Sequence, residues 1–463
     1  MKKGDLVVGV VEKLKFPNVG LVSVEGETIE VKNVIPGQKI ELRVAKAGRG
    51  RMKGRLQRIL EPSSFENADQ VCPHFGICGG CFMQTVPYDK QLELKEQMIR
   101  RMFVPVMGEE KFDSVYEGIK ASPLSREYRN KMEFSFGNEV KDGPLRLGMH
   151  KRGSFYDIVE VTDCQICDET FRGILSTTVD FFRKKELDFF HKMAHTGYLR
   201  HLLVREGQME GQYLVDLVTS TQIDAAYEKE LLDEWVSLLT EKYSDGRIVG
   251  ILHTRNDSQS DAVIDEGTDI LYGQNYFYES LLGLKFKVTP FSFFQTNSKG
   301  AEVLYSEARD YILSDGEKLG EVFDLYSGTG TIAQVLSPSC VHVTGVEIVE
   351  EAVEAAKENA ALNGLTNCDF IAGDVFKVLE GLETKPDMIV LDPPRDGVAP
   401  KALKKIISYG VDKMIYIACK PSSLARDIPT LEEAGYKVVR MGLVDMFPST
   451  ANVEAVCLLS KLG

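Results

Sequence analysis

The sequence predicts a mixed α/β protein, with a small N-terminal β-barrel, a central α+β segment and a C-terminal parallel sheet flanked by helices. Short strands separated by turn residues fill the first 60 positions, which is typical of a small barrel. From Glu321 onward, strand–turn–helix units repeat, which indicates a parallel α/β sheet. A chain of 463 residues exceeds one ordinary core. We therefore expect domains at 1–60, 61–290 and 291–463, with part of 88–120 packing on the last.

The N-terminal segment combines short apolar strands with a local excess of basic residues. The predicted strands are 6–11, 21–24, 29–31 and 40–44, with a possible fifth at 55–60. Residues 1–60 hold 13 Lys or Arg and 6 Asp or Glu, although the whole chain has a net charge of −14. The closely spaced basic residues are Lys46, Arg49, Arg51, Lys53, Arg55 and Arg58. They form either a solvated strand and loop or a surface that contacts phosphates.

Three cysteines, Cys72, Cys78 and Cys81, lie within ten residues of a loop that contains Gly and Pro. The chain has nine cysteines, and their odd number and uneven spacing do not fit a secreted disulfide framework. Three close thiolates with a distant fourth suit zinc or a 4Fe–4S cluster equally on spacing alone. A helix is predicted from Tyr88 to about Phe103.

Residues 121–290 alternate strands with amphipathic stretches such as 170–193 and 225–242. We find no chemical motif between 170 and 285. This region is therefore interpreted as a substrate-binding segment by elimination.

A glycine-rich turn, 327–331, follows the buried strand 321–326 and precedes a short helix at 331–336. The next strand ends at Glu347, 19 residues after Gly328, where a carboxylate can accept hydrogen bonds from ribose hydroxyls. A helix is predicted at 350–362. This pattern also fits the fingerprint of dinucleotide-binding proteins and does not decide the ligand alone.

Two features downstream of the glycine-rich turn favour one ligand class. Asp374 ends a third strand and suits an adenine amino group, and the strand 388–391 delivers Asp392-Pro-Pro-Arg395. An acidic residue followed by two prolines at this point resembles the motif of nucleic-acid methyltransferases and no nicotinamide site. The sequence therefore predicts a methyl-donor site.

A cysteine and a glutamate mark the last two strands. Cys419 follows the strand 414–418, one strand beyond Asp392, and ligands of open α/β sheets gather at these carboxyl ends. An isolated cysteine is more often a buried structural residue, but this position favours a nucleophile beside the donor. Glu454 lies in the last strand, 452–459, and is either a base or an exposed charge at a strand start.

These motifs together resemble those of the RNA 5-methyluridine methyltransferase family, in particular its 23S ribosomal-RNA branch with a TRAM barrel and an iron–sulfur cluster. The likeness covers nearly the whole chain. The motifs that carry it are Cys72-x5-Cys78-x2-Cys81 with Cys164, Tyr128-Arg-Asn-Lys131, Phe293-Phe-Gln-Thr-Asn297, Asp324-Leu-Tyr-Ser-Gly-Thr-Gly330, Asp392-Pro-Pro-Arg395 and Ile417-Ala-Cys-Lys-Pro421.

The resemblance implies a Rossmann-like class I methyltransferase domain that uses S-adenosylmethionine and acts on RNA, with 23S rRNA as the expected substrate. The donor contacts that it implies are Gln295, Tyr326, Glu347, Asp374 and Asp392.

The resemblance also favours a 4Fe–4S cluster over zinc. Its implied ligands are Cys72, Cys78, Cys81 and Cys164, with Cys167 as a nearby competitor for the fourth position. Because methyl transfer needs no electrons, we expect the cluster to have a structural or RNA-orienting role.

In this family the thiol adds to carbon 6 of uracil and makes carbon 5 nucleophilic. Cys419 is the implied nucleophile, and Glu454 is the implied base that later removes the proton from carbon 5. The family usually has a histidine two places before this glutamate, whereas this chain has Asn452.

Several alternatives compete with this interpretation. A 5-methylcytosine methyltransferase would have a cysteine beside the proline motif, and an amino-group methyltransferase would have an aromatic residue there, whereas this chain has Arg395. Transfer RNA is the alternative substrate. A catalytically degenerate RNA-binding iron–sulfur protein is the alternative outside the enzymes, because the histidine is missing.

No run of apolar residues approaches the roughly 20 that span a bilayer, and Asp5 and Glu12 interrupt any secretory signal. We therefore expect a cytoplasmic, monomeric protein without a membrane partner.

Overall fold

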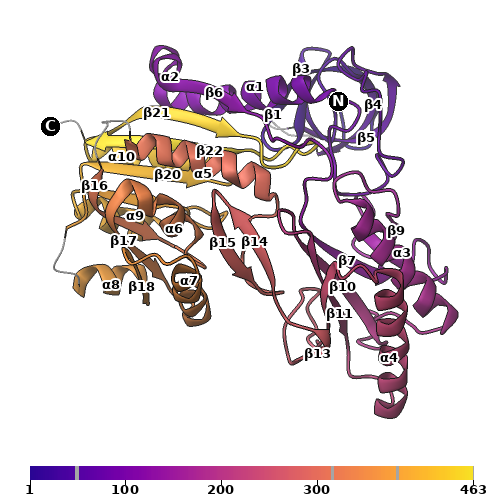
Figure 1. Cartoon of the computed structure of the whole chain (residues 1–463). Coiled ribbons are helices and arrows are strands. Elements are labelled where there is room, and N and C mark those ends of the chain that lie inside the picture. Colours follow the sequence, from indigo (N-terminus) through magenta and orange to yellow (C-terminus); the bar gives the residue numbers. More distant parts are fainter. Residues whose placement is uncertain (47–51, 314–317, 382–384, 462–463) are drawn as a thin grey trace.

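The computed structural model describes residues 1–46, 52–313, 318–381 and 385–461. It confirms the predicted mixed α/β architecture, with a closed five-stranded barrel, a seven-stranded sheet, a two-stranded hairpin and an eight-stranded sheet. Figure 1 shows the hairpin between the two larger sheets, with the barrel on the side of the chain's N-terminus. Within the described ranges, no helix combines the length and apolar character needed to cross a membrane.

The barrel buries one face of each of its strands. Its strands are β1 (Leu6–Lys15), β2 (Val19–Val24), β3 (Glu27–Lys32), β4 (Lys39–Lys46) and β5 (Met52–Glu61). Their order is β1-β2-β3-β5-β4, and pairing of β1 with β4 closes the barrel. Val22, Ile29 and Leu42 fill its interior at alternate positions. The possible fifth strand is thus present, whereas Arg49 and Arg51 of the basic tract lie outside the described residues.

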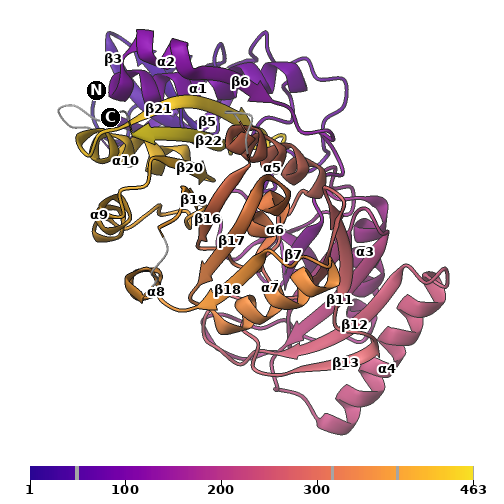
Figure 2. The same cartoon turned by 60° about the vertical axis from the view of Figure 1, so that its left-hand side comes forward.

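The segment after the cysteine-rich loop packs on the C-terminal sheet. It contains α1 (Tyr88–Met107), α2 (Glu109–Val115) and β6 (Tyr116–Lys120). β6 pairs in parallel with β21 (Tyr436–Val444) and forms the edge of the eight-stranded sheet. Figure 2 shows α1, α2 and β6 along β21. The helix predicted at 88–103 is therefore present and extends to Met107.

The central sheet carries two helices on one face. Its strands are β7 (Lys131–Gly137), β8 (Arg146–His150), β9 (Ile158–Glu160), β10 (Leu199–Gly207), β11 (Gln212–Thr219), β12 (Ile248–Arg255) and β13 (Thr268–Gly273). Helix α3 (Glu169–Lys184) begins where Asp168 accepts a hydrogen bond from the Phe171 amide, and α4 (Ala225–Lys242) begins at the equivalent cap Asp224. The amphipathic stretch 170–193 is thus helical only as far as Lys184.

The eight-stranded sheet has the order β18-β17-β16-β19-β20-β22-β21-β6. Its remaining strands are β16 (Leu319–Leu325), β17 (Cys340–Glu347), β18 (Cys368–Ala372), β19 (Met388–Leu391), β20 (Lys413–Ala418) and β22 (Glu454–Lys461). The helices that follow the parallel strands are α6 (Thr331–Leu336), α7 (Glu350–Leu362), α8 (Val375–Gly381), α9 (Pro400–Ser408) and α10 (Pro421–Glu433). The strand order reverses between β16 and β19, and such a switch point is the usual ligand site of an open α/β sheet.

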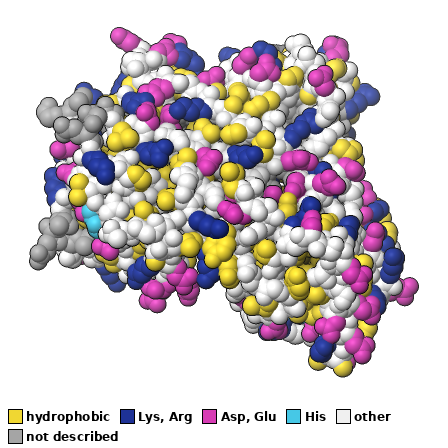
Figure 3. Space-filling model, in the orientation of Figure 1, with side chains coloured by type: hydrophobic (Ala, Val, Ile, Leu, Met, Phe, Trp, Pro, Cys, Tyr) yellow, Lys and Arg dark blue, Asp and Glu magenta, His cyan; other side chains and the backbone are white. Residues whose placement is uncertain are grey.

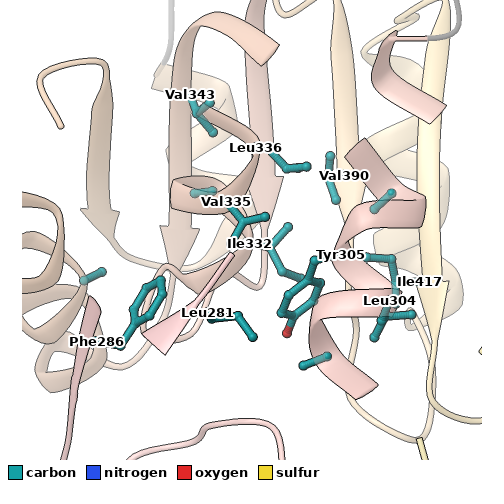
Figure 4. Packing of buried hydrophobic residues seen from close by; sticks show 14 of the residues in the cluster. Leu281, Phe286, Leu304, Tyr305, Ile332, Val335, Leu336, Val343, Val390 and Ile417 are labelled. Carbon is teal, nitrogen blue, oxygen red and sulfur yellow. The ribbon is translucent and has the colours of Figure 1, made fainter. Parts of the chain in front are cut away.

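A shared core joins the hairpin to the C-terminal sheet. The hairpin consists of β14 (Phe277–Leu281) and β15 (Leu284–Val288), and α5 (Ser298–Ile312) follows it. Figure 4 shows Leu281 and Phe286 of the hairpin, Tyr305 of α5 and Ile332 of α6 within one apolar cluster. The hairpin therefore contributes to the core that supports the switch point. The domain boundaries at 60 and 290 stay predictions.

Candidate active site

The glycine-rich turn follows β16 at the switch point, and two of its residues have a positive φ. Tyr326 has φ 68° and Gly330 has φ 72°. A Cβ atom at Gly330 would lie 2.5 Å from the Phe370 ring and 2.7 Å from the Ala356 side chain, so only glycine fits there. The turn therefore keeps the end of β16 open toward a ligand.

Glu347 and Asp374 lie beside this turn, at the ends of the next two strands. Glu347 Oε2 accepts a hydrogen bond of 3.0 Å from the Gly328 amide, and its Oε1 accepts one of 2.8 Å from the Ile348 amide. Burial raises the pKa of Tyr326, and the nearby Asp374 carboxylate raises it further. The structure thus brings three of the predicted donor contacts together around one turn.

Two buried polar atoms of the turn have no partner within the described part of the chain. They are Asp324 Oδ1 and Ser327 Oγ, whereas Asp324 Oδ2 accepts a hydrogen bond of 3.0 Å from the Ala333 amide. Asp324 is fully buried, and desolvation raises its pKa to about 8 with a further contribution from Asp392. Sequence reasoning missed this residue, although its motif was identified. An unpartnered buried carboxyl oxygen marks a place for a hydrogen-bond donor from a ligand.

Asp392 follows β19 on the other side of the switch point. Burial raises its pKa to about 7, and it interacts electrostatically with Tyr305 and Glu454. The Tyr305 hydroxyl hydrogen-bonds with Gln295, which brings this predicted contact to the same place. The Gln295 carbonyl is held by Asn130 Nδ2 at 3.0 Å.

Cys419 and Glu454 meet where β20 and β22 pair. The antiparallel register joins Ile417 to Val456 and Ala418 to Ala455, so its next step brings Cys419 opposite Glu454. Cys419 is partly accessible, whereas Glu454 is only 2% exposed. Glu454 is therefore not the exposed charge at a strand start that the sequence left as an alternative.

Burial and neighbouring acids raise the pKa of both side chains. Desolvation raises the pKa of Cys419 to about 11, with contributions from Glu454 and Asp392, and raises the pKa of Glu454 to about 8. The Arg395 guanidinium acts in the opposite direction and lowers the pKa of both groups. Sequence reasoning used Arg395 only to discriminate between families and missed this role. Each group acts in its ionised form, which becomes more populated as the pH rises.

The charges around the switch point select the class of ligand. Asp324, Asp392 and Glu454 all have a raised pKa, and Glu347 lies beside the turn. A ligand with net positive charge would stabilise their carboxylates, whereas the pyrophosphate of a dinucleotide would be repelled. The charges of these groups therefore suit a cationic ligand such as a sulfonium methyl donor.

The predicted cysteine ligands lie together in the central region. Cys72, Cys78, Cys81 and Cys164 line one cavity, whose other walls include Phe75 and Met132. Cys167 is fully buried in the core beneath α3 and is not among the residues that line this cavity. Of the two candidates for the fourth ligand, Cys164 thus lines the cavity and Cys167 does not.

Hydrogen bonds point at the sulfur atoms of the cavity. The Gly80 amide donates to Cys78 Sγ at 3.4 Å, and Gln84 Nε2 donates to Cys81 Sγ at 3.5 Å. Such donors favour thiolate ligands. In the described ranges, no three Cys, His, Asp or Glu side chains converge closely enough to hold a single metal ion.

Comparisons with known proteins agree with the geometry. The family model described as "tRNA (Uracil-5-)-methyltransferase" matches residues 87–462. An uncharacterized RNA methyltransferase of Clostridium tetani is 46% identical over 461 residues, covering 100% of this chain and 99% of the relative. One of Caldanaerobacter subterraneus is 45% identical and covers both chains completely.

A solved structure is similar over nearly the entire chain. It is the Pyrococcus abyssi tRNA (uracil-54, C5)-methyltransferase in complex with S-adenosyl-L-homocysteine, with a TM-score of 0.74 and 26% identity. The similarity covers 98% of this chain and 100% of that one.

Proposed function

The chain belongs to the tRNA (uracil-5-)-methyltransferase family and is an S-adenosylmethionine-dependent RNA methyltransferase; we propose that it methylates carbon 5 of a uridine through a covalent bond to Cys419. The pairing of β20 with β22 carries this proposal, because its register brings Cys419 opposite Glu454. A nucleophile and a base at one sheet edge are what addition and elimination on uracil require. They also argue against a catalytically degenerate RNA-binding protein.

The residues around the switch point fit the donor. Gln295, Tyr326, Glu347, Asp374 and Asp392 would hold it, and the unpartnered Asp324 Oδ1 would accept a hydrogen bond from it. When bound, the donor supplies an electrophilic methyl group on a positively charged sulfur. Its charge lowers the pKa of the surrounding carboxyl groups, because each carboxylate then gains a nearby cation.

The Cys419 thiolate starts the reaction on uracil. Its sulfur bonds to carbon 6, and the electron pair of the double bond between carbons 5 and 6 shifts toward the carbon 4 carbonyl. Carbon 5 of this enolate-like adduct then displaces the methyl group from the sulfonium. A bond from carbon 5 to the methyl carbon forms as the bond from methyl to sulfur breaks. Arg395 lowers the pKa of Cys419 and so favours the thiolate.

The Glu454 carboxylate completes the reaction. It takes the proton of carbon 5, and the released electron pair restores the double bond to carbon 6. The bond between carbon 6 and sulfur then breaks, and the Cys419 thiolate leaves. Because Arg395 lowers the pKa of Glu454, it also favours the form that accepts this proton.

Variants of the two residues should block different steps. Cys419→Ala should bind donor and RNA but form no adduct with 5-fluorouridine RNA, which traps the wild type because fluorine cannot leave as a cation. Glu454→Gln should slow turnover by a factor of about 10²–10⁴. On RNA that contains ordinary uridine in place of 5-fluorouridine, it should accumulate a denaturation-resistant protein–RNA complex in which the RNA has been methylated. Gel shift under denaturing conditions with labelled donor measures both. Cys368→Ala, a half-buried thiol on β18, is the control. Turnover by Cys419→Ala would contradict covalent catalysis.

We propose that the enzyme is a monomer and that its substrate is 23S rRNA. The TRAM-like barrel and the cysteine cavity support this choice of substrate. Transfer RNA is the second candidate, favoured by the likeness to the Pyrococcus abyssi tRNA enzyme. Mapping 5-methyluridine in both RNA classes from a strain that lacks this gene distinguishes them. We expect loss of the modification from 23S rRNA, and loss from tRNA alone would identify the alternative.

The barrel supports RNA binding through unusual cross-strand pairs. Arg43 lies opposite Arg55, and Lys46 lies opposite Lys53, on β4 and β5. Like charges directly opposite each other destabilise a sheet. None of the four has an ion pair with a described residue, and Lys53 and Arg55 are exposed. Figure 3 shows acidic and basic side chains interspersed over the face of the protein that it draws. The four cations that face each other across β4 and β5 lack acidic partners among the described residues, which suits contact with phosphates.

Neutralising these four cations should weaken RNA binding and its salt dependence. Replacing all four by Gln should reduce the slope of log K against log salt by up to about 3, since each contact with a single-stranded phosphate contributes about 0.7. Fluorescence anisotropy over a salt series measures this slope. The control replaces Lys39 and Arg58 by Gln, because both already pair with acids on the same strands. An equal effect of both variants would argue against specific phosphate contacts.

We further propose that Cys72, Cys78, Cys81 and Cys164 hold a 4Fe–4S cluster. Protein purified without oxygen should be brown and contain about four irons per chain. Cys164→Ser should lose this iron, whereas Cys167→Ser should retain it because Cys167 is not among the cavity-lining residues. Metal analysis of both variants measures the difference. Stoichiometric zinc without iron would contradict the assignment.

A further inference from the structure

The loop 445–453 determines where Glu454 lies. It joins β21 to β22, and Val444 and Glu454 face each other as the last pair before the loop. In the described part of the chain, no side chain or amide hydrogen-bonds to the Glu454 carboxylate. The backbone that enters β22 must therefore set the position of this carboxylate.

A single buried lysine connects the two ends of this loop. Lys95 projects from α1 and is completely buried, as is Asp445. Its Nζ donates to Asp445 Oδ1 at 2.6 Å, at the exit of β21. It also donates to the carbonyl of Phe447 at 3.1 Å and to that of Asn452 at 3.0 Å, at the entry to β22. All three ammonium protons thus hold one loop from both sides.

The buried ion pair between Lys95 and Asp445 keeps the lysine side chain in place. An unpaired buried ammonium is strongly disfavoured, so Lys95 is retained in place by its partners. Asp445 Oδ1 also accepts a hydrogen bond of 3.0 Å from the Phe447 amide. The ion pair therefore shapes the start of the loop as well as anchoring it to α1.

Three other segments hold the middle of the same loop through hydrogen bonds. Ser449, which has a positive φ of 66°, donates its amide to Gln91 Oε1 at 2.7 Å. The amides of Phe82 and Met83, directly after Cys81, donate to the Ser449 carbonyl. The Tyr128 hydroxyl donates to the Pro448 carbonyl at 3.0 Å. Helix α1, the cysteine-rich loop and the motif around Tyr128 thus converge on the loop that precedes Glu454.

We propose that Lys95 is a positioning residue that fixes Glu454 against Cys419 for removal of the carbon 5 proton. This inference rests on the roles proposed above for Cys419 and Glu454. The Asn452 carbonyl, two residues before Glu454, is the point at which Lys95 acts on the strand that carries the base. This contact uses the backbone carbonyl of residue 452 and not its side chain.

Lys95→Met tests this role, because methionine keeps the length of the side chain and removes the charge. We expect product formation to fall by about 10²-fold through misplacement of the base, with KM for donor and RNA unchanged. A denaturation-resistant complex with methylated RNA should accumulate, as for Glu454→Gln. Trapping by 5-fluorouridine RNA, which needs Cys419 and methyl transfer but no removal of a proton from carbon 5, should stay normal. Denaturing gels and steady-state kinetics give these values.

Two further variants separate positioning from stability. Lys95→Met combined with Asp445→Leu removes both buried charges, avoids an unpaired carboxylate and should show the same accumulation. Lys111→Met breaks an ion pair with Glu432 between α2 and α10 and should leave turnover unchanged. Circular dichroism gives the folded fraction for each protein.

The outcomes distinguish this inference from the proposed function. If Glu454→Gln accumulates the complex but neither Lys95 variant does, positioning by Lys95 is wrong and the base assignment stands. A loss of turnover that only follows the folded fraction would also overturn it. If Glu454→Gln turns over normally, both the base assignment and the inference that rests on it are wrong.

Discussion

Strand β22 lies antiparallel between β20 and β21, and its register decides which side chains meet at the end of the sheet. Val456 and Leu458 pack into the core beneath Tyr305, whereas Ala455, Cys457 and Leu459 pack into the core on the other face. A slip of one residue would exchange these two sets. Because both faces are buried, the register is strongly specified, and Glu454 is held on the face of Cys419. The chemistry of the site therefore depends on apolar packing several residues away.

Electrostatics give the same site its preference for a cation. Asp324, Asp392 and Glu454 are buried where water cannot stabilise their charges, so burial raises the pKa of each. A positively charged donor compensates for this desolvation and also shifts Glu454 toward the form that accepts a proton. In the proposed mechanism, donor binding and the activation of Glu454 as a base therefore both follow from one positive charge.

The sequence predicted the barrel, the parallel sheet and the gathering of Tyr326, Glu347 and Asp374, because these features follow from local periodicity and from the rule for strand ends. It could not predict the partners of Lys95 or the burial of Glu454. Lys95 and Asp445 are 350 positions apart, and no local pattern encodes such a contact. Asp324 was missed for a related reason. An acidic residue within a strand does not by itself indicate a ligand contact, and only the structure shows that one of its carboxyl oxygens has no partner among the described residues. That Cys164 lines the cysteine cavity and Cys167 does not likewise follows only from the folded chain.

The edge strand β6 is made before the central sheet, yet it pairs with β21 near the other end of the chain. During synthesis, β6 is therefore made well before β21, and the ribosome must add all residues between the two strands before they can pair. Until β21 leaves the ribosome, Phe103 of α1 and Phe112 of α2 lack the strand against which they are buried in the finished protein. Pairing over such a separation has a large loop-closure cost and is slow. A product truncated before β21 would therefore leave the apolar side chains of α1 and α2 without the strand that covers them.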